Sequence, residues 1–286
     1  MADGVECPGT ELLPTVPFGP VEVTRLMSGG NPLCGNSHFS PEMDADMRRH
    51  FSAEAVVRYL HRLQECGINT LQARGDYHRV LYWLELFKRE GGRLHWIAQT
   101  ASEMADVVQN IRVIAAAGAV GIYHHGTQTD RFWREDRIDD CLDYLKCMRD
   151  CGVQVGLGTH IPQVIEYSEE QGWDVDFYMA CFYNLSRTPR ESALVSGKAS
   201  GGEVYPDEDP PRMCETIRAT GKTCLAFKIM AAGRNCATQA DVRAAFEFAF
   251  ANIKPQDAVV VGMFDKYLDQ IGLNVGHVRE VLGKGG

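Results

Sequence analysis

The sequence predicts one α/β domain over residues 1–286, a (β/α)₈ TIM barrel in which eight parallel strands alternate with helices. Three observations predict this fold. The chain has 286 residues, and such barrels occupy roughly 250 residues as a single domain. Short apolar runs alternate with stretches of helical periodicity, a pattern typical of βαβ units and a parallel sheet. Gly67, Gly118 and Gly152 each precede an apolar run, where the end of a helix favours a left-handed residue.

The eight apolar runs are the predicted strands. They cover residues 21–28, 68–72, 94–99, 119–124, 153–159, 175–183, 223–230 and 258–263. The stretches with helical periodicity include 53–66, 102–117, 136–151, 162–171, 240–252 and 274–282. Residues 186–211 carry glycines and prolines without periodicity and follow the sixth strand. Such long stretches in compact domains are usually lids or substrate loops, so we expect a lid here; an insertion without a role is the alternative.

The composition excludes several classes of partner. Hydrophobic residues make up 45% and charged residues 23% of the chain, the balance of a globular protein with a large core. A formal net charge of −9 argues against nucleic acid and anionic membrane surfaces, because both need a basic face. No apolar run approaches the ~18 residues that span a bilayer. We therefore expect a small-molecule substrate, no nucleic acid and no membrane; the sequence leaves a homo-oligomer open.

The cysteines and the first residues bear on the compartment. Ten cysteines occur without a CxxC pair, and most lie inside apolar strand or helix patterns. That spacing argues against both a disulfide scaffold and a structural zinc site. The opening segment has neither the basic nor the apolar region of a signal peptide. We therefore expect reduced thiols in a cytoplasmic protein.

Four segments resemble the aldo-keto reductases, and together they span nearly the whole chain. Residues 17–30 resemble the start of that family and residues 66–70 its second strand. Residues 259–263 and 268–275 resemble its eighth strand and the helix on the cofactor side. The resemblance implies a barrel whose floor is closed by a short N-terminal hairpin, a site at the carboxyl ends of the strands, and NAD(P) as cofactor.

The chain departs from that family at most of its catalytic tetrad. The four matching positions hold Gln72, Tyr77, Gln99 or Thr100, and His124 or His125. The family's Asp and Lys are thereby replaced, while its proton-donating tyrosine is matched by Tyr77. Without a neighbouring cation, the pKa of Tyr77 is expected to stay at about 10, which makes proton donation harder. The eighth-strand region offers Lys266 and little else for a 2′-phosphate, so the sequence argues against NADPH-dependent carbonyl reduction.

Histidines lie at three strand exits, where barrels of this kind carry their active sites. His38 lies in the loop after the first strand, and His160 ends the fifth. His124 and His125 end the fourth strand, which neighbours the fifth. His124 or His125 and His160 are therefore candidate general acids and bases. The alternative is that these imidazoles only hydrogen-bond the substrate or the backbone.

The same imidazoles suggest a metal site. Neutral side chains of His38, His124 and His160, if they converge, would suit a divalent ion such as Zn²⁺, Mn²⁺ or Fe²⁺. Gln72, Glu166 or water would complete the ligand shell. The chain carries no HxxxH or HExxH motif, so a polar pocket without metal is the alternative.

Lys228 is a candidate base or Schiff-base residue. It lies in the seventh apolar run, 223–230, and the outward face of a barrel strand packs on helices. A lysine there is better placed pointing inward near the mouth, where burial lowers its pKa. A structural ion pair with Asp176 or Asp265 is the alternative.

Five further residues are expected to bind substrate. Arg234 follows the seventh strand, in the region where this fold often holds an anion, and Arg74 ends the second strand region. Tyr183 and Asn184 end the sixth strand, where an aromatic wall would suit a sugar or another ring; plain packing is the alternative. Gln72 stands where the family has its catalytic aspartate.

These observations favour a non-reductase enzyme on an aldo-keto-reductase-like barrel. We expect an isomerase, epimerase or lyase that moves a proton next to a carbonyl or hydroxyl of a small polar, sugar-like substrate, with or without a metal. The catalytic candidates are Tyr77, His124, His125, His160 and Lys228. The alternative is a divergent NAD(P)-dependent oxidoreductase, and the third hypothesis is a non-catalytic binding barrel. The step from barrel to enzyme is an analogy at the level of the fold.

Overall fold

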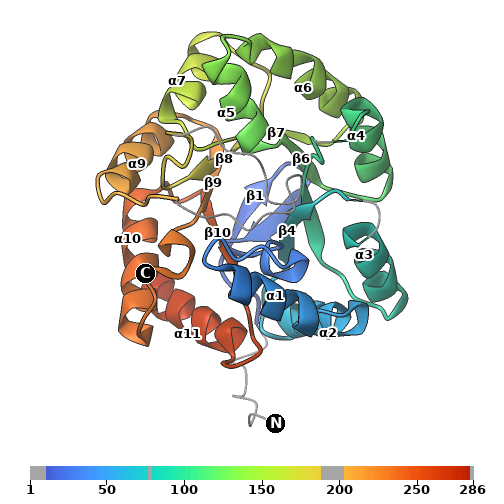
Figure 1. The fold of residues 1–286 in the computed structure, drawn as a ribbon, viewed down its shortest axis with the longest axis vertical. Coiled ribbons are helices and arrows are strands. Elements are labelled where there is room, and N and C mark those ends of the chain that lie inside the picture. Colours follow the sequence, from blue (N-terminus) through green and yellow to red (C-terminus); the bar gives the residue numbers. More distant parts are fainter. Residues whose placement is uncertain (1–10, 77–78, 103, 188–202, 284–286) are drawn as a thin grey trace.

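The computed structural model describes residues 11–76, 79–102, 104–187 and 203–283. Its centre is a closed barrel of eight parallel strands in the order β10-β3-β4-β5-β6-β7-β8-β9, which confirms the predicted fold class (Figure 1). The strands are β3 (Leu26–Gly29), β4 (Thr70–Arg74), β5 (His95–Gln99), β6 (Gly121–His124), β7 (Gln154–Thr159), β8 (Phe177–Cys181), β9 (Thr223–Phe227) and β10 (Ala258–Gly262).

Helices form a ring around this barrel (Figure 1). The α-helices are α1 (Pro41–His50), α2 (Ala53–Glu65), α3 (Val80–Arg89), α4 (Val107–Ala116), α5 (Gly126–Arg134), α6 (Cys141–Asp150), α7 (Pro162–Glu170), α9 (Asp209–Ala219), α10 (Gln239–Asn252) and α11 (Gln270–Gly283). The short 3₁₀ helices are η1 (Pro32–Cys34), η2 (Ile138–Asp140) and η3 (Ala231–Gly233). Helix α5 is not among the helical stretches named from the sequence, and it carries a residue of the candidate site.

The expected first strand, residues 21–28, is two strands. Residues Val21–Thr24 form β2, which pairs antiparallel with β1 (Thr15–Phe18), whereas the barrel strand β3 begins at Leu26. The chain changes sheet at Arg25, whose guanidinium is held by the carbonyl of Asp257 at 3.0 Å. The sequence predicted one strand over 21–28, although the charged residue Arg25 stands at the point where the two strands separate.

The β1–β2 hairpin closes the floor of the barrel, as the family resemblance implies. Gly19 turns the hairpin with φ of +58°, a left-handed conformation that glycine adopts without strain. The ring of Phe18 packs edge-on against Phe177, the first residue of β8, at 4.9 Å. Glycines make room for these rings, because a Cβ on Gly121 or Gly156 would come within 3 Å of Phe18 or Phe177.

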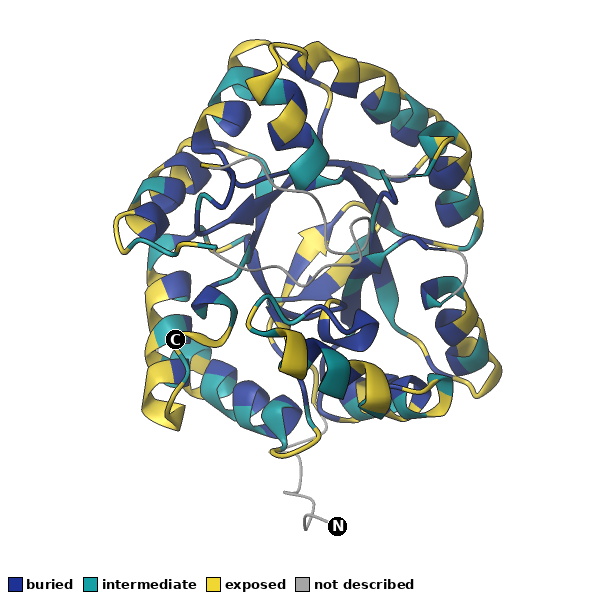
Figure 2. Cartoon of the chain, viewed as in Figure 1, coloured by how far each residue is buried: buried dark blue, intermediate teal, exposed yellow. Residues whose placement is uncertain are grey.

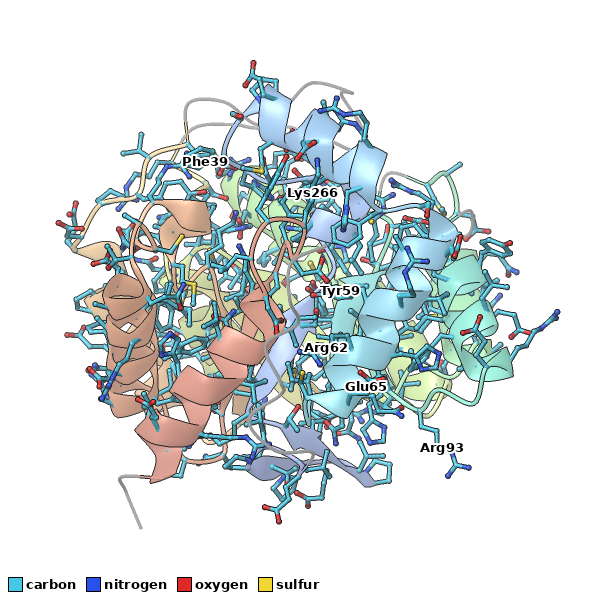
Figure 3. All side chains as sticks on the ribbon, turned by 90° about the horizontal axis from the view of Figure 1, so that it is seen from below. Phe39, Tyr59, Arg62, Glu65, Arg93 and Lys266 are labelled. Carbon is cyan, nitrogen blue, oxygen red and sulfur yellow. The ribbon has the colours of Figure 1, made fainter. Side chains whose placement is uncertain are left out.

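Two apolar cores flank the strands. One fills the barrel interior with side chains such as Met27, Ile97 and Leu225, and the larger one lies between the strands and the helices. The barrel strands are accordingly mostly buried, whereas the floor hairpin and the outer faces of the helices carry exposed residues (Figure 2). Figure 3 shows the barrel from the side, with Phe39 toward the mouth and Arg93 toward the floor.

None of the described helices is long and apolar enough to cross a membrane. The free thiols among the described residues are Cys34, Cys141, Cys147, Cys151, Cys181, Cys214, Cys224 and Cys236. Cys66 departs from the expectation of reduced thiols, because it is disulfide-bonded.

Candidate functional site

A histidine–aspartate pair lies at the carboxyl ends of the strands, where barrels of this fold carry their chemistry. His160 follows β7, and Asp130 lies on α5 after the neighbouring strand. Nδ1 of His160 lies 2.6 Å from Oδ2 of Asp130. Asp130 is fully buried and His160 is 5% exposed. The carboxylate also accepts hydrogen bonds from the hydroxyl of Thr159 at 2.6 Å and from the hydroxyl of Ser186.

The surroundings of Asp130 keep it ionised. Burial on its own raises the pKa of this carboxyl, but the charge of His160 and the hydrogen bonds from His160, Ser186 and Thr159 outweigh it and hold the pKa below its ordinary value. An ionised Asp130 accepts a hydrogen bond from the Nδ1–H of His160, which keeps the proton of the neutral imidazole on Nδ1.

His124 lies outside the barrel, although the sequence made it a catalytic and metal-ligating candidate. Side chains alternate along β6, and Tyr123 points inward, where its hydroxyl bonds Gln72 at 2.8 Å. His124 therefore points into the helix layer, where it stacks on Tyr144 at 5.2 Å and hydrogen-bonds the hydroxyl of Thr129 at 2.8 Å. Burial lowers its pKa to about 4. His124 is thus a neutral packing residue.

The proposed metal ligands do not come together. Nδ1 of His38 lies 3.0 Å from Glu203, and its Nε2 lies 3.3 Å from Asn31. His124 is in the helix layer, and His160 pairs with Asp130. Across the described part of the chain, no three His, Cys, Asp or Glu side chains are arranged to hold a metal ion. The other suggested ligand, Glu166, hydrogen-bonds Arg212 and Thr216 on α9 instead.

Loops from three strands meet over the mouth in what we call the mouth cluster: His38, Glu203, Tyr205, Lys228 and Arg234. Glu203 accepts from the hydroxyl of Tyr205 at 2.5 Å and faces His38 at 3.0 Å. The Tyr205 ring lies 4.3 Å from the guanidinium of Arg234 and 5.9 Å from Nζ of Lys228. Arg234 also donates to the carbonyl of His38 at 3.2 Å. The cluster ties the loops after β3, β8 and β9 together.

Lys228 stands at the mouth in a strained backbone conformation. Its φ is +60°, which costs an L-residue about 1–2 kcal/mol. Strain of this kind gathers at functional sites. The carboxylates suggested as structural partners are bound elsewhere, because Asp176 pairs with Arg149 at 2.8 Å and Asp265 with His50 at 3.6 Å. The inward placement that the sequence indicates is consistent with the cavity that Lys228 lines.

The cavity beside Lys228 has a volume of about 350 Å³, and we call it the mouth cavity. It lies between the ends of β3, β9 and β10 and the first turns of α10 and α11. Gln72 lines it from β4, and Phe227 lines it from β9. The Phe227 ring also meets the His160 ring edge-on at 5.7 Å. His160 itself lines a separate, smaller pocket of about 150 Å³ together with Cys181 and Asn184. The Phe227 ring is thus the contact between the histidine–aspartate pair and the mouth cavity.

The remaining expected residues take different places. Arg74 is largely buried and faces Asp76 at 3.9 Å. The backbone N–H of Asn184 donates to Asp209 at 2.9 Å. His125 is the N-cap residue of α5, and its backbone N–H donates to the hydroxyl of Thr100 at 3.1 Å. Tyr77 lies outside the described residues.

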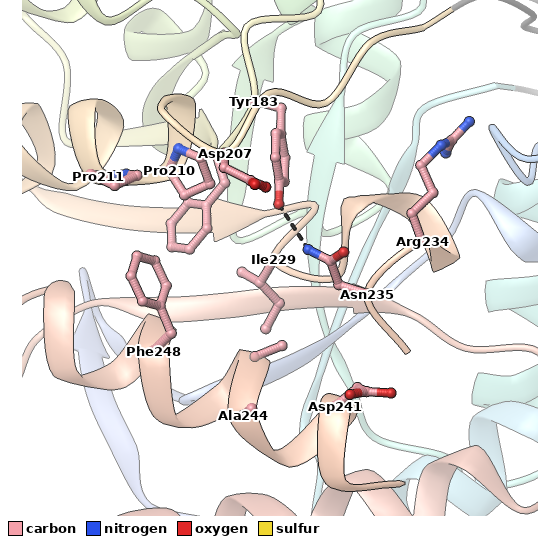
Figure 4. Close-up of a pocket in the computed structure, with 12 residues that line it drawn as sticks. Tyr183, Asp207, Pro210, Pro211, Ile229, Arg234, Asn235, Asp241, Ala244 and Phe248 are labelled. Atoms are coloured by element: carbon pink, nitrogen blue, oxygen red, sulfur yellow. Dashed lines mark hydrogen bonds between the residues drawn. The ribbon is translucent and has the colours of Figure 1, made fainter. Parts of the chain in front are cut away.

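A second pocket of about 500 Å³ opens between α9 and α10, outside the mouth cavity (Figure 4). Tyr183 and Arg234 line it, and the Tyr183 hydroxyl accepts from Asn235 at 3.2 Å. Tyr183 also meets the Tyr205 ring at 5.1 Å. Tyr183 thus borders both the second pocket and the mouth cluster.

Sequence reasoning missed Asp130, Glu203 and Tyr205. Asp130 follows Gly126 by four residues, and both lie on the buried face of α5, so an acidic residue on an otherwise buried helix face was the available signal. Glu203 approaches His38 from 165 residues away. No local pattern predicts that contact.

Comparison with solved structures identifies several barrels of the same fold. A protein described as an aldo-keto reductase from Pseudomona aeruginosa is 18% identical, with a TM-score of 0.57 over 95% of this chain and 97% of that one. The glycerol dehydrogenase of Gluconobacter oxydans is 12% identical, with a TM-score of 0.53 over 94% and 90%. The dihydropteroate synthase of Xanthomonas albilineans is 17% identical, with a TM-score of 0.54 over 96% and 98%.

No protein-family model matches the sequence, and no curated protein matches it either. The structural likeness includes reductases and a synthase at similar TM-scores, so it concerns the fold rather than one activity. The chain therefore shares with these proteins the fold of a closed barrel of eight parallel strands.

Proposed function

We propose that the protein is an enzyme that transfers a proton at a carbon next to a carbonyl or hydroxyl of a small polar substrate, as isomerases, epimerases and lyases do. The observation that carries this proposal is the His160–Asp130 pair at the mouth of the barrel, beside a cavity lined by Lys228. Buried carboxylate–histidine pairs are typical of general acid–base sites. The likeness to enzymes of the same fold adds support by analogy only.

In this mechanism His160 and Lys228 have separate roles. Nε2 of His160 takes a proton from the substrate carbon and returns it, while Asp130 holds the imidazole and stabilises the imidazolium that forms. The ammonium group of Lys228 stabilises the negative charge that develops on the substrate oxygen. The substrate would extend from the mouth cavity, which Lys228 lines, past the Phe227 ring to His160.

Solvent exchange tests the proposal without knowledge of the natural reaction. The carbon-bound hydrogens of hydroxyacetone, dihydroxyacetone and glyceraldehyde are followed by ¹H NMR in D₂O with catalytic amounts of protein. We expect exchange above the buffer rate for at least one compound, and a fall of about 10²-fold or more in the His160→Gln variant. Glutamine retains an N–H donor for Asp130, so this variant should fold.

The matched control is His61→Gln, since His61 lies on the outer helix α2 and pairs with Glu90. It should exchange at the wild-type rate. Wild-type exchange in His160→Gln, or no exchange with any of the three compounds, would refute the proposal and favour a non-catalytic binding barrel.

A nicotinamide-dependent oxidoreductase is the second candidate function. The mouth cavity reaches the first turn of α11, the helix that resembles the cofactor-side helix of the aldo-keto reductases. Lys266 pairs with Asp46 at 2.6 Å, and Asp269 caps α11 by accepting from the N–H of Gly272 at 2.9 Å. These two carboxylates disfavour a 2′-phosphate, so this candidate predicts binding of NADH in preference to NADPH. Fluorescence titration with each cofactor tests it.

A further inference from the structure

The polar lining of the mouth cavity consists mainly of carboxamides. These side chains are Asn31, Asn36, Gln72, Gln239, Gln270 and Asn274. Among the described lining residues there is no aspartate, glutamate or arginine, and Lys228 is the one lysine. Carboxamides offer both donors and acceptors without charge, so they suit hydroxyl or amide groups of a ligand.

The two helices that begin at the cavity have their positive ends already neutralised. At α10, Thr238 and Asp241 form a capping box, in which the Asp241 carboxylate accepts from the N–H of Thr238 at 2.8 Å. At α11, Asp269 accepts from the N–H of Gly272 and also pairs with Arg62 at 2.8 Å. Helix N-termini bind phosphate through free N–H groups and a positive dipole. Acidic side chains of the chain itself take that place here.

The neighbouring cations are also engaged. Arg234 donates to the carbonyls of His38 and Ala231, each at 3.2 Å, and stacks on Tyr205. Lys266 pairs with Asp46. The region after the seventh and eighth strands, which holds anions in many barrels, therefore offers no basic cluster around the cavity in the described part of the chain.

One buried acceptor at the cavity lacks a donor. Asn36 is 8% exposed, and its Oδ1 has no hydrogen-bond partner among the described residues. Asn274, on the first turns of α11, is 6% exposed and lines the same cavity. Buried polar groups are nearly always satisfied in folded proteins, and a ligand is one way to satisfy them.

We infer that the mouth cavity binds an uncharged cyclic compound that carries O–H or N–H donors and no phosphate. This inference rests on the proposed function, for which it names the substrate class. Asn36 accepts a hydrogen bond from the compound, and Asn274 contributes a second polar contact. Apolar side chains such as Met43, Val242 and Leu273 pack against its ring faces. The volume of about 350 Å³ accommodates a single small ligand.

Paired probes test the charge selectivity by calorimetry on the full chain. The pairs are myo-inositol with inositol 1-phosphate, glucose with glucose 6-phosphate, and adenosine with its 5′-monophosphate. We expect at least one uncharged member to bind at least tenfold more tightly than its phosphorylated partner. Tighter binding of the phosphorylated members, tight binding of NADH, or no binding in any pair would overturn the inference.

The Asn36→Leu variant separates a binding role from a structural one. It should weaken the uncharged probe at least tenfold and leave the melting temperature unchanged or higher, because the side chain has no internal partner for Oδ1 to lose. The control is Asn110→Leu, since Asn110 is fully buried and bonds the N–H of Ala101 and the carbonyl of Gly75. That control should melt several degrees lower.

A fall in melting temperature for Asn36→Leu as large as for Asn110→Leu, with probe binding unchanged, would assign Asn36 to structure and overturn the inference. Binding does not require His160, so the inference and the proposed function fail separately. If the wild-type protein binds an uncharged probe but catalyses no proton exchange, the proposed function is wrong and the inference stands. If the wild-type protein catalyses proton exchange but binds none of the uncharged probes, the inference is wrong and the proposed function stands.

Discussion

Two buried groups at neighbouring strand ends show how environment sets the role of a side chain. Asp130 is surrounded by donors and stays charged, whereas His124 is surrounded by aromatic rings and stays neutral. The first can orient an imidazole at the mouth, and the second holds α5 and α6 against the barrel. Both roles follow from what each side chain contacts, so each can be tested by one substitution.

The Asp130→Asn variant should lose activity while it keeps the shape of the site. An amide can donate to Nδ1 of His160, which favours the tautomer that places the proton on Nε2 and removes the base. We expect the solvent-exchange rate to fall by about 10²-fold or more, with little change in KM for the compound that exchanges. An exchange rate within threefold of wild type would show that Asp130 does not fix the tautomer.

His124 should make the protein less stable in mild acid. Its folded pKa of about 4 lies below the unfolded value of 6.5, so the unfolded chain binds the proton first and stability falls as the pH drops from 6.5 toward 4. Between pH 7 and pH 5 this one group should cost about 2 kcal/mol. Urea unfolding at both pH values measures it. The His124→Phe variant keeps the stacking and should lose this part of the pH dependence; an unchanged dependence would assign it to other groups.

Substitutions of Lys228 separate chemistry from packing. Lys228→Met keeps the apolar stem and removes the charge, so the exchange rate should fall at least tenfold with the fold intact. Lys228→Gly also removes the strain of the left-handed backbone conformation. Because glycine loses more conformational entropy on folding, the free energy of unfolding of this variant should equal that of the wild type within about 1 kcal/mol. If Lys228→Met unfolds more easily while its folded fraction exchanges at the normal rate, the lysine is structural.

At the scale of secondary-structure elements, periodicity predicted the strands better than it predicted the facing of their side chains. The run at 119–124 contains β6, but the sequence alone did not say that Tyr123 faces the barrel and His124 the helices. The alternation rule would settle it only with the register known. The run at 21–28 was predicted as one strand, whereas its first half pairs with β1 and its second half with β10. Apolar residues occur on both sides of Arg25, so the change of sheet partner was not apparent from the pattern.

The glycines of β6 and β7 allow the packing at the floor of the barrel to be tested. A Cβ on Gly156 would lie 2.3 Å from the ring of Phe177, which is fully buried and has no room to move. The Gly156→Ala variant should therefore be destabilised by about 1–3 kcal/mol through overpacking. Gly152→Ala is not a suitable control because its φ is +74°; Gly221→Ala is, since nothing lies near its Cβ. Equal stability of the two variants would contradict the packing of the floor.

At the scale of the whole molecule, the fold was predictable and the site only partly so. Alternating patterns extend over the whole chain and are mutually consistent, which is why the sequence predicts eight strands. His160 was predictable because a strand exit identifies it. Its partner Asp130 and the contact of His38 with Glu203 depend on how loops from different strands meet, and no pattern within either segment records that.

Substitutions at the two ends of the barrel should have different effects. In this fold, residues at the carboxyl ends of the strands serve catalysis, and residues at the floor serve stability. Phe18 is 3% exposed on the floor, and Phe18→Ala should cost about 3–5 kcal/mol through the cavity it leaves. The folded fraction of this variant should catalyse hydrogen exchange of the substrate with D₂O at the wild-type rate.

The mouth lies far from this floor residue. Lys228 follows the carboxyl end of β9, whose five residues span about 16 Å. For two substitutions that far apart, the changes in the free energy of unfolding add to within about 0.5 kcal/mol. The Phe18→Ala/Lys228→Met double variant should therefore combine the stability loss of the first with the activity loss of the second. A coupling above about 1 kcal/mol in urea unfolding would mean that the floor packing reaches the mouth.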